Sequence, residues 1–97
     1  MRHLYNTGFS KNHDMLLPQL QMRGNKLFGT VNHPAYGTPK SSLAMPWFEI
    51  KGDKIFTTRH NPQGHDLHPW YEIRGNDVYQ TINHPDGLSH MPTFRIK

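Results

Sequence analysis

The sequence predicts an all-β fold of four hairpins with pseudo-four-fold symmetry, built from one short repeated unit. Gly24, Gly52 and Gly75 each open a segment that begins Gly-Asn or Gly-Asp and continues into a hydrophobic pair. β-branched and aromatic residues alternate with polar ones, and no stretch carries the apolar stripe of a helix. A period in this range is typical of repeat architectures. The spacing of the glycines divides the 97 residues into units 1–23, 24–51, 52–74 and 75–97.

The four units carry the same kinds of side chain at matching positions. The fourth position is aliphatic, the fifth aromatic and the seventh threonine, and a proline near the end precedes two apolar residues. These rows are Leu4, Leu27, Ile55 and Val78; Tyr5, Phe28, Phe56 and Tyr79; Thr7, Thr30, Thr58 and Thr81; Pro18, Pro46, Pro69 and Pro92; Leu20, Phe48, Tyr71 and Phe94; and Met22, Ile50, Ile73 and Ile96. Each unit ends on a base, namely Arg23, Lys51, Arg74 or Lys97.

Alternation along a strand assigns these rows to two faces. We expect the row of Leu20, Phe48, Tyr71 and Phe94 to share the core with the aliphatic rows. The aromatic row that begins at Tyr5 falls on the opposite face. There it either packs between neighbouring units or offers stacking platforms for a sugar or a nucleobase. Packing is favoured because a repeat fold has to fix the angle between its units.

Strands and loops alternate along the chain. We expect a first strand at 3–8 and a last strand at 93–97, with three hairpins between them that span the unit boundaries. The hairpins lie at roughly 19–29, 47–58 and 70–81. The connecting loops are rich in Pro, Gly, Asn and His, which are common turn residues. These loops cover 9–17, 32–45, 60–68 and 83–91.

The hairpin turns fix the register of the strands. Glycine at the first central position supplies the positive φ that a type II′ turn requires. With two-residue turns, Ile50 should face Ile55 on one face, and Ile73 should face Val78. On the other face, Glu49 should stand across from Phe56 and Glu72 across from Tyr79.

The same pattern predicts that the two ends of the chain meet. Ile96 should sit opposite Leu4, so that the chain termini replace a glycine turn and complete a fourth hairpin. Closure would leave no edge strand. A continuous eight-stranded closed barrel and four splayed hairpin petals both fit the sequence.

Composition narrows the class of protein. The length suits a single domain with one modest core. The chain has no cysteine, which excludes disulfides, zinc–cysteine sites and cysteine nucleophiles. Its formal charge of +4 permits a nucleic-acid partner, but no basic run is present. The N-terminus lacks a secretory apolar stretch and no window approaches a membrane span, so we expect a soluble, cytoplasmic protein without a membrane partner.

The segments from Phe48 to Phe56 and from Tyr71 to Tyr79, each followed by a Thr-initiated turn, carry a family resemblance. They resemble the four-fold β-flower, a small bacterial domain of uncharacterised function. The resemblance covers the whole chain, although the first unit lacks the glycine, the His-Pro loop and the Glu-Ile pair. It implies four hairpin petals around a pseudo-four-fold axis. It implies no activity.

Histidines are abundant in the loops and suggest one candidate site. In a closed ring, His33, His60 and His84 could converge into a transition-metal site with an open position. However, His33 and His84 occupy the tenth position of their units, whereas His60 occupies the ninth. The simpler interpretation is that these histidines are turn residues. We therefore expect no cofactor, with a transition metal as the alternative.

Deviations from the repeat suggest a second candidate site. Trp47 and Trp70 occur in only two units, where the other two carry Gln19 and Thr93, so we expect the tryptophans to mark a binding surface. The insertion at 35–42 lies in a loop and also breaks the symmetry.

Taken together, these residues favour a non-enzymatic binding or assembly module. The interpretation of Glu49 and Glu72 as surface polar pairs is preferred to an acid–base pair, so an enzyme is not favoured. The expected ligand-binding residues are Trp47, Trp70, His33, His60 and His84. The partner that they would bind is an unknown protein, a small molecule or a second copy of the chain. The alternatives are a metal-binding protein and a basic nucleic-acid-binding module.

Overall fold

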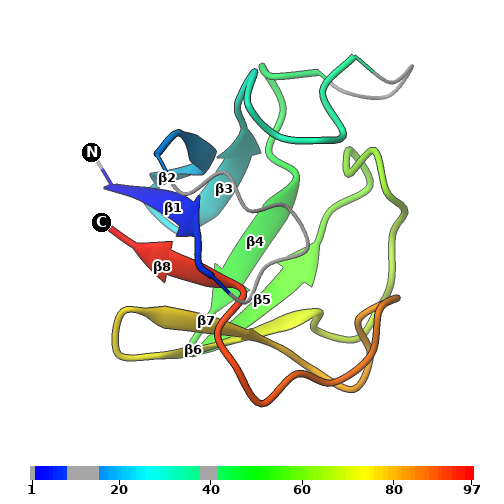
Figure 1. Ribbon diagram of the computed structural model, residues 1–97. Helices are drawn as coiled ribbons and strands as arrows, with labels where there is room; N and C mark the ends of the chain where they lie inside the picture. The colour runs from blue at the N-terminus through cyan, green and yellow to red at the C-terminus, as the bar shows by residue number, and fades with distance from the viewer. Residues whose placement is uncertain (1, 9–15, 38–41) are drawn as a thin grey trace.

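The protein is a closed antiparallel barrel of eight strands (Figure 1). The computed structural model describes residues 2–8, 16–37 and 42–97. Its strands are β1 (Arg2–Asn6), β2 (Pro18–Arg23), β3 (Lys26–Gly29), β4 (Phe48–Lys51), β5 (Lys54–Thr57), β6 (Tyr71–Arg74), β7 (Asp77–Gln80) and β8 (Phe94–Ile96). Among the described residues, no helix is long and apolar enough to cross a membrane.

Each strand pairs with its neighbours in sequence, and β1 pairs with β8 to close the sheet. Leu4 lies opposite Ile96, so the two ends of the chain are adjacent, as Figure 1 shows. The predicted fold class and the meeting of the ends are both confirmed. Of the two arrangements that the sequence left open, the structure has the continuous barrel.

The hairpin registers follow the turn prediction. Ile50 pairs with Ile55, and Ile73 pairs with Val78. Gly52 has a φ of 65° and Gly75 a φ of 63°, while no non-glycine residue in the described chain has a positive φ. A positive φ confined to the first central residue is what a type II′ turn requires.

The core is built mainly from two neighbouring rows of the repeat. The aliphatic row of Leu4, Leu27, Ile55 and Val78 is at most 1% exposed, and it lies beside the buried row of Leu20, Phe48, Tyr71 and Phe94. Within the second row, the rings of Phe48, Tyr71 and Phe94 meet edge to face with centroids 5.6 Å apart. Edge-to-face contacts of this kind add stability beyond area burial. Both rows lie where the sequence predicted.

The aromatic row on the outer face is covered by the protein's own cations. The arginine or lysine that ends each unit lies over the outer aromatic ring of the strand that follows it around the barrel. Its charged group is 4.5–5.5 Å from the ring centroid. The pairs are Arg23 over Phe28, Lys51 over Phe56, Arg74 over Tyr79 and Lys97 over Tyr5. The last pair joins the two ends of the chain, so this contact continues around the whole ring.

A second cyclic contact joins neighbouring strands near the open end of each hairpin. The hydroxyl of each repeat threonine donates a hydrogen bond to the carbonyl oxygen of a repeat proline. The pairs are Thr30 with Pro18, Thr58 with Pro46, Thr81 with Pro69 and Thr7 with Pro92. The threonine row supplies the donor and the proline row the acceptor of one hydrogen bond that is repeated in the barrel, which explains why the two rows recur together.

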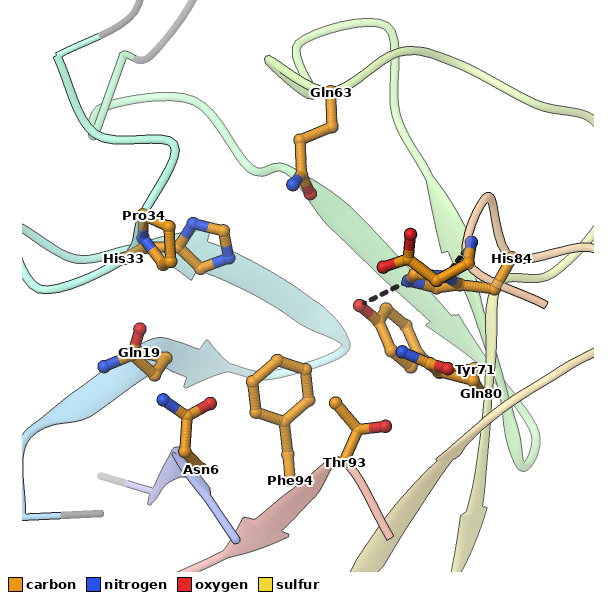
Figure 2. Close-up of a pocket in the computed structure, with 11 residues that line it drawn as sticks. Asn6, Gln19, His33, Pro34, Gln63, Tyr71, Gln80, His84, Thr93 and Phe94 are labelled. Atoms are coloured by element: carbon orange, nitrogen blue, oxygen red, sulfur yellow. Dashed lines mark hydrogen bonds between the residues drawn. The ribbon is translucent and has the colours of Figure 1, made fainter. Parts of the chain in front are cut away.

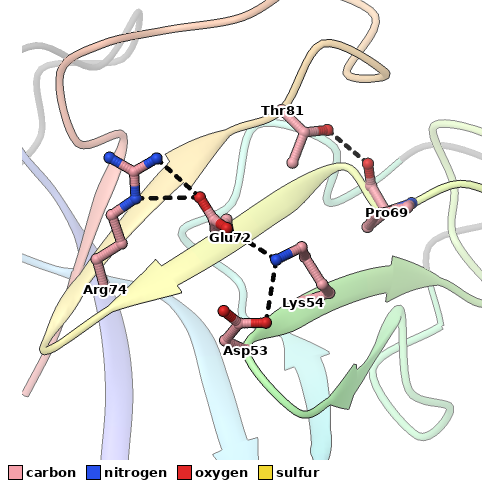
Figure 3. Close-up of polar contacts among 6 residues, drawn as sticks. All are labelled: Asp53, Lys54, Pro69, Glu72, Arg74 and Thr81. Atoms are coloured by element: carbon pink, nitrogen blue, oxygen red, sulfur yellow. Dashed lines mark hydrogen bonds and ion pairs between the residues drawn. The ribbon is translucent and has the colours of Figure 1, made fainter.

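Glu49 and Glu72 form surface ion pairs, as the sequence indicated. Figure 3 shows Glu72 between Lys54, at 2.8 Å, and Arg74, at 2.9 Å. The hydrogen bonds from Lys54 and then Arg74 lower the pKa of Glu72. Glu49 lies opposite Phe56 and Glu72 opposite Tyr79, both as predicted.

Candidate functional site

The barrel contains a pocket of about 650 Å³ at the end where the long loops gather. Its lining comes from strand ends and from the loops after β3, β5 and β7. The lining residues are Asn6, Gln19, His33, Pro34, Gln63, Tyr71, Gln80, His84, Asp86, Thr93 and Phe94. Figure 2 shows His33 and Pro34 on one side, and Tyr71 and His84 on the opposite side. We call this cavity the loop-end pocket.

The two tryptophans are core residues, which corrects the expectation that they form an exposed binding surface. Trp47 is 1% exposed and Trp70 is 4% exposed. The indole N–H of Trp47 donates to the carbonyl oxygen of Ser42 at 2.9 Å. Their occurrence in only two units suggested a special role, but it reflects how the end of the barrel is filled.

Each tryptophan follows the repeat proline of its unit, and the matching residues in the other two units are Gln19 and Thr93. Gln19 and Thr93 line the loop-end pocket, whereas neither tryptophan does. The indoles therefore occupy their half of the barrel end. The shorter side chains leave the other half open.

The sixth position of each unit varies together with the position that carries either a tryptophan or a shorter side chain. A Cβ added to Gly29 would lie 2.3 Å from the indole of Trp47, so the first indole fits only beside a glycine. In the unit with the second indole the sixth residue is Thr57, and both Thr57 and Trp70 bond Asp66. The two units without tryptophan carry amides there, Asn6 and Gln80, which line the pocket.

Gln19 is the most unusual residue of the pocket. It is 1% exposed, and its Nε2 donates to the carbonyl oxygen of Leu17 at 3.3 Å. Its Oε1 is the only buried side-chain polar atom in the described part of the chain that has no hydrogen-bond partner. Such atoms are rare in folded proteins, and each one calls for an explanation.

Tyr71 and His84 present a hydrogen-bond donor to the pocket. The backbone N–H of Asp86 donates to Nδ1 of His84 at 3.0 Å, so the neutral imidazole carries its proton on Nε2. That nitrogen lies 3.0 Å from the Tyr71 hydroxyl oxygen and donates to it (Figure 2). The hydroxyl proton of Tyr71 is then left for another acceptor. Burial raises the pKa of Tyr71, so the hydroxyl stays protonated.

His33 is a second neutral donor. Its Nδ1 accepts the backbone N–H of Ala35 at 3.0 Å, which puts the ring proton on Nε2. Its ring meets Trp47 edge to face at 5.1 Å. Burial lowers the pKa of His33 to about 4, so the imidazole is uncharged at neutral pH.

The structure does not bring His33, His60 and His84 together. His60 lies outside the lining of the pocket that contains the other two. The described residues contain no group of three or more histidine and acidic side chains placed to hold a metal ion. The three histidines therefore do not form the metal site that the sequence suggested, and His33 and His84 lie on opposite sides of the pocket (Figure 2).

The tenth position of the unit has a local structural task instead. His33 and His84 each accept the N–H of the residue two positions later, and Asn61 Oδ1 accepts that of Gln63 in the same way, at 2.8 Å. The turn-residue interpretation of His33 and His84 thus explains their common position. Both also reach the pocket.

None of the described residues of the loop insertion, 35–37 and 42, lines the pocket. Ala35 packs into the core and Tyr36 is 49% exposed. Residues 38–41 of the insertion, and His13 and Ser10 of the first loop, lie outside the described residues.

Of the residues that line the pocket, the sequence predicts only His33 and His84 as binding residues. Tyr71 and Phe94 lie in the core, as predicted, and also line the pocket. A signal for Gln19 was present, because it replaces an indole in the repeat. The pattern in the sequence draws attention to the tryptophans, whereas the residues that replace them line the pocket.

Charge is sparse around the pocket. Among the described residues that line it, Asp86 is the one acidic side chain, and lysine and arginine are absent. Comparisons of the chain with models of protein families, with curated proteins and with solved structures find no match.

Proposed function

We propose that the protein is a small non-enzymatic binding module and that its ligand occupies the loop-end pocket. The observation that carries this proposal is a cavity of about 650 Å³ that is lined by Gln19, a residue whose Oε1 is buried and has no hydrogen-bond partner. A buried acceptor without a donor costs about 1–3 kcal/mol. A ligand that donates to this oxygen offsets that cost once the Gln19 amide turns the oxygen toward the cavity.

The volume and composition of the pocket support this role. Binding pockets for small molecules span roughly 300–1,000 Å³ and combine apolar walls with a few polar groups. Here Phe94 and Pro34 supply apolar surface, and the amides and imidazoles supply the polar groups.

Binding is favoured over catalysis by the state of the titratable groups. A general acid or base works best when its pKa lies near the operating pH. Burial moves the pKa of His33 down to about 4 and that of Tyr71 upward, so both remain neutral at pH 7.

The proposal is tested by filling the pocket. The double variant Gln80→Thr with Thr93→Trp gives the fourth unit the pair of side chains that the third unit has in Thr57 and Trp70. Ligand-observed NMR with a set of uncharged polar fragments should detect binders of the natural chain that the double variant no longer binds.

Val31→Trp is the matched control, because it adds an indole to the same end of the barrel at a side chain that is 60% exposed. This control should keep the fragment hits. If the natural chain binds no fragment, or if the filled variant binds the same fragments equally well, the proposal is wrong.

The two alternative functions have weaker support. A metal site is less favoured because the three candidate histidines are not gathered. A nucleic-acid surface is less favoured because the four bases that end the units already lie over the outer aromatic rings. Membership of the four-fold β-flower family remains part of the proposal, supported by the ring of four hairpins and its repeated contacts.

A further inference from the structure

We propose that the ligand of the loop-end pocket is a neutral saccharide, held through its hydroxyl groups. This inference rests on the proposed binding function and narrows it to one chemical class. It is carried by the unpartnered Gln19, by the distribution of neutral polar groups around the pocket, and by the orientation of its aromatic rings.

The polar groups come from several sides of the pocket. Gln63 belongs to the loop after β5, Gln80 to β7 and Gln19 to β2, while His33 lies in the loop after β3. Figure 2 shows Gln63 on the opposite side of the pocket from Asn6. A sugar ring carries hydroxyls around its whole rim, and polar groups on several walls suit that shape.

The hydrogen-bonding character of these groups also suits hydroxyls. Gln19 Oε1 lacks a donor. The Tyr71 hydroxyl, which accepts from His84, and the His33 ring, whose proton is on Nε2, each have a proton to donate. A hydroxyl both donates and accepts, so one type of ligand group satisfies both needs. A site built to hydrogen-bond a hydroxyl discriminates strongly against analogues that lack it.

Electrostatics argues against an anionic ligand. The described lining includes the carboxylate of Asp86 and no lysine or arginine. Phosphate and carboxylate groups are recognised by cations or by helix N-termini, and the described chain has no helix. Sugar phosphates and nucleotides are therefore poor candidates.

Ring geometry argues against a flat base. Intercalation of a nucleobase needs two parallel aromatic faces. Tyr71 meets Phe94 at 61° and His84 at 65°, so these rings form an edge-to-face wall instead of a slot. Such a wall still offers apolar surface to the C–H groups of a sugar.

The experiment is a titration with neutral mono- and disaccharides: glucose, galactose, mannose, N-acetylglucosamine, maltose and cellobiose. Glucose 6-phosphate and adenosine are included for comparison. Binding is followed by chemical-shift changes of the side-chain amides in ¹H–¹⁵N NMR spectra. We expect at least one neutral sugar to give saturable shifts at Gln63 and Gln80, and the phosphorylated sugar and adenosine to give none there.

Gln19→Met tests the residue that carries the inference. It keeps the size of the side chain and removes the acceptor, so sugar affinity should fall about tenfold, the equivalent of one hydrogen bond. The thermal midpoint of the free variant should not fall, which shows that the loss is not unfolding. Gln21→Met is the matched control on the outer side of the same strand, where the side chain accepts from Arg23, and it should leave affinity unchanged.

The outcomes separate the two proposals. If adenosine, the phosphorylated sugar or other fragments bind in the pocket while neutral sugars do not, the saccharide inference is overturned and the binding function stands. If the sugars and the fragments all fail to bind, both fall. If a sugar binds but Gln19→Met binds it equally well, the assignment of Gln19 is wrong and the inference loses its basis.

Discussion

At the scale of single residues, one position per unit decides whether the barrel end is filled or open. Trp47 and Trp70 fill their half, and Gln19 and Thr93 leave the pocket. The same backbone accepts either choice because the neighbouring sixth position changes in size as well. Gly29 beside Trp47 is the clearest case.

Gly29→Ala should destabilise the protein because its Cβ would lie 2.3 Å from the Trp47 ring. The ring is closely packed, so relief requires a shift of the core, at a cost of about 1–3 kcal/mol. Urea unfolding followed by tryptophan fluorescence measures the change.

Gly8→Ala is the control, since nothing lies within 4 Å of a Cβ added there and Gly8 does not have a positive φ. It should be close to neutral. Combining Gly29→Ala with Trp47→Phe should cost less than the sum of the two single changes. Additive losses would contradict a direct contact between the two sites.

His33 should make stability depend on pH. Its pKa is about 4 in the folded protein and 6.5 ordinarily, so between these values the unfolded chain binds a proton that the folded chain does not. Stability contributed by the neutral ring is therefore complete above pH 6.5 and is lost as the pH falls toward 4, by on the order of 3 kcal/mol.

Urea unfolding across this pH range should show a shallower decline for His33→Asn than for the natural chain. Asparagine is chosen because Asn61 makes the same turn contact at the matching position. His65→Asn, at an exposed loop residue, should keep the natural slope. Equal slopes for all three proteins would refute the assignment of this pH dependence to His33.

At the scale of elements, neighbouring hairpins are matched by charge as well as by hydrogen bonds. Lys54 pairs with Glu72 between β5 and β6, whereas Asp77 pairs with Arg95 between β7 and β8, at 3.1 Å. The interface between β7 and β8 thus carries an equivalent ion pair, with the acidic and basic residues exchanged between the two strands. Both arrangements occur at the same register, so either order of the two signs is compatible with it.

Asp77→Lys should therefore destabilise the barrel slightly, because it places like charges across from each other at Arg95. Adding Arg95→Glu should restore the loss, since the pair then has the signs of Lys54 and Glu72. We expect a recovery of about 0.2–1 kcal/mol, the usual range for exposed pairs, measured by urea unfolding. The recovery should shrink at high salt. A double variant less stable than Asp77→Lys would contradict the idea.

At the scale of the whole molecule, contacts that repeat around the ring also bridge its two ends. Thr7 donates a hydrogen bond to Pro92, the ammonium of Lys97 lies over the Tyr5 ring, and Leu4 pairs with Ile96. The two ends of the chain, on β1 and β8, therefore lie where the other hairpins have a turn. Closure of the sheet depends on contacts between residues at opposite ends of the sequence.

Much of this arrangement could be predicted because it is local or repeated. The turn at Gly52 fixed the pairing of Ile50 with Ile55, and alternation placed Tyr71 and Phe94 in the core. Repetition then extended one hairpin to four. The pocket could not be predicted in this way, because it results from departures from the repeat whose packing is not encoded by their position in the sequence.

From the sequence alone, backbone chemistry determined the strands, the glycine turns, the registers and the meeting of the chain ends, because these depend on local conformation and on alternation with period two. Only the tertiary structure decided between barrel and petals, because pairing across units is a long-range contact. It also decided that the indoles are buried, that His60 stands apart, and that Gln19 is left with a buried, unpartnered oxygen beside a pocket. Those outcomes depend on how side chains from all four units share the volume at one end of the barrel.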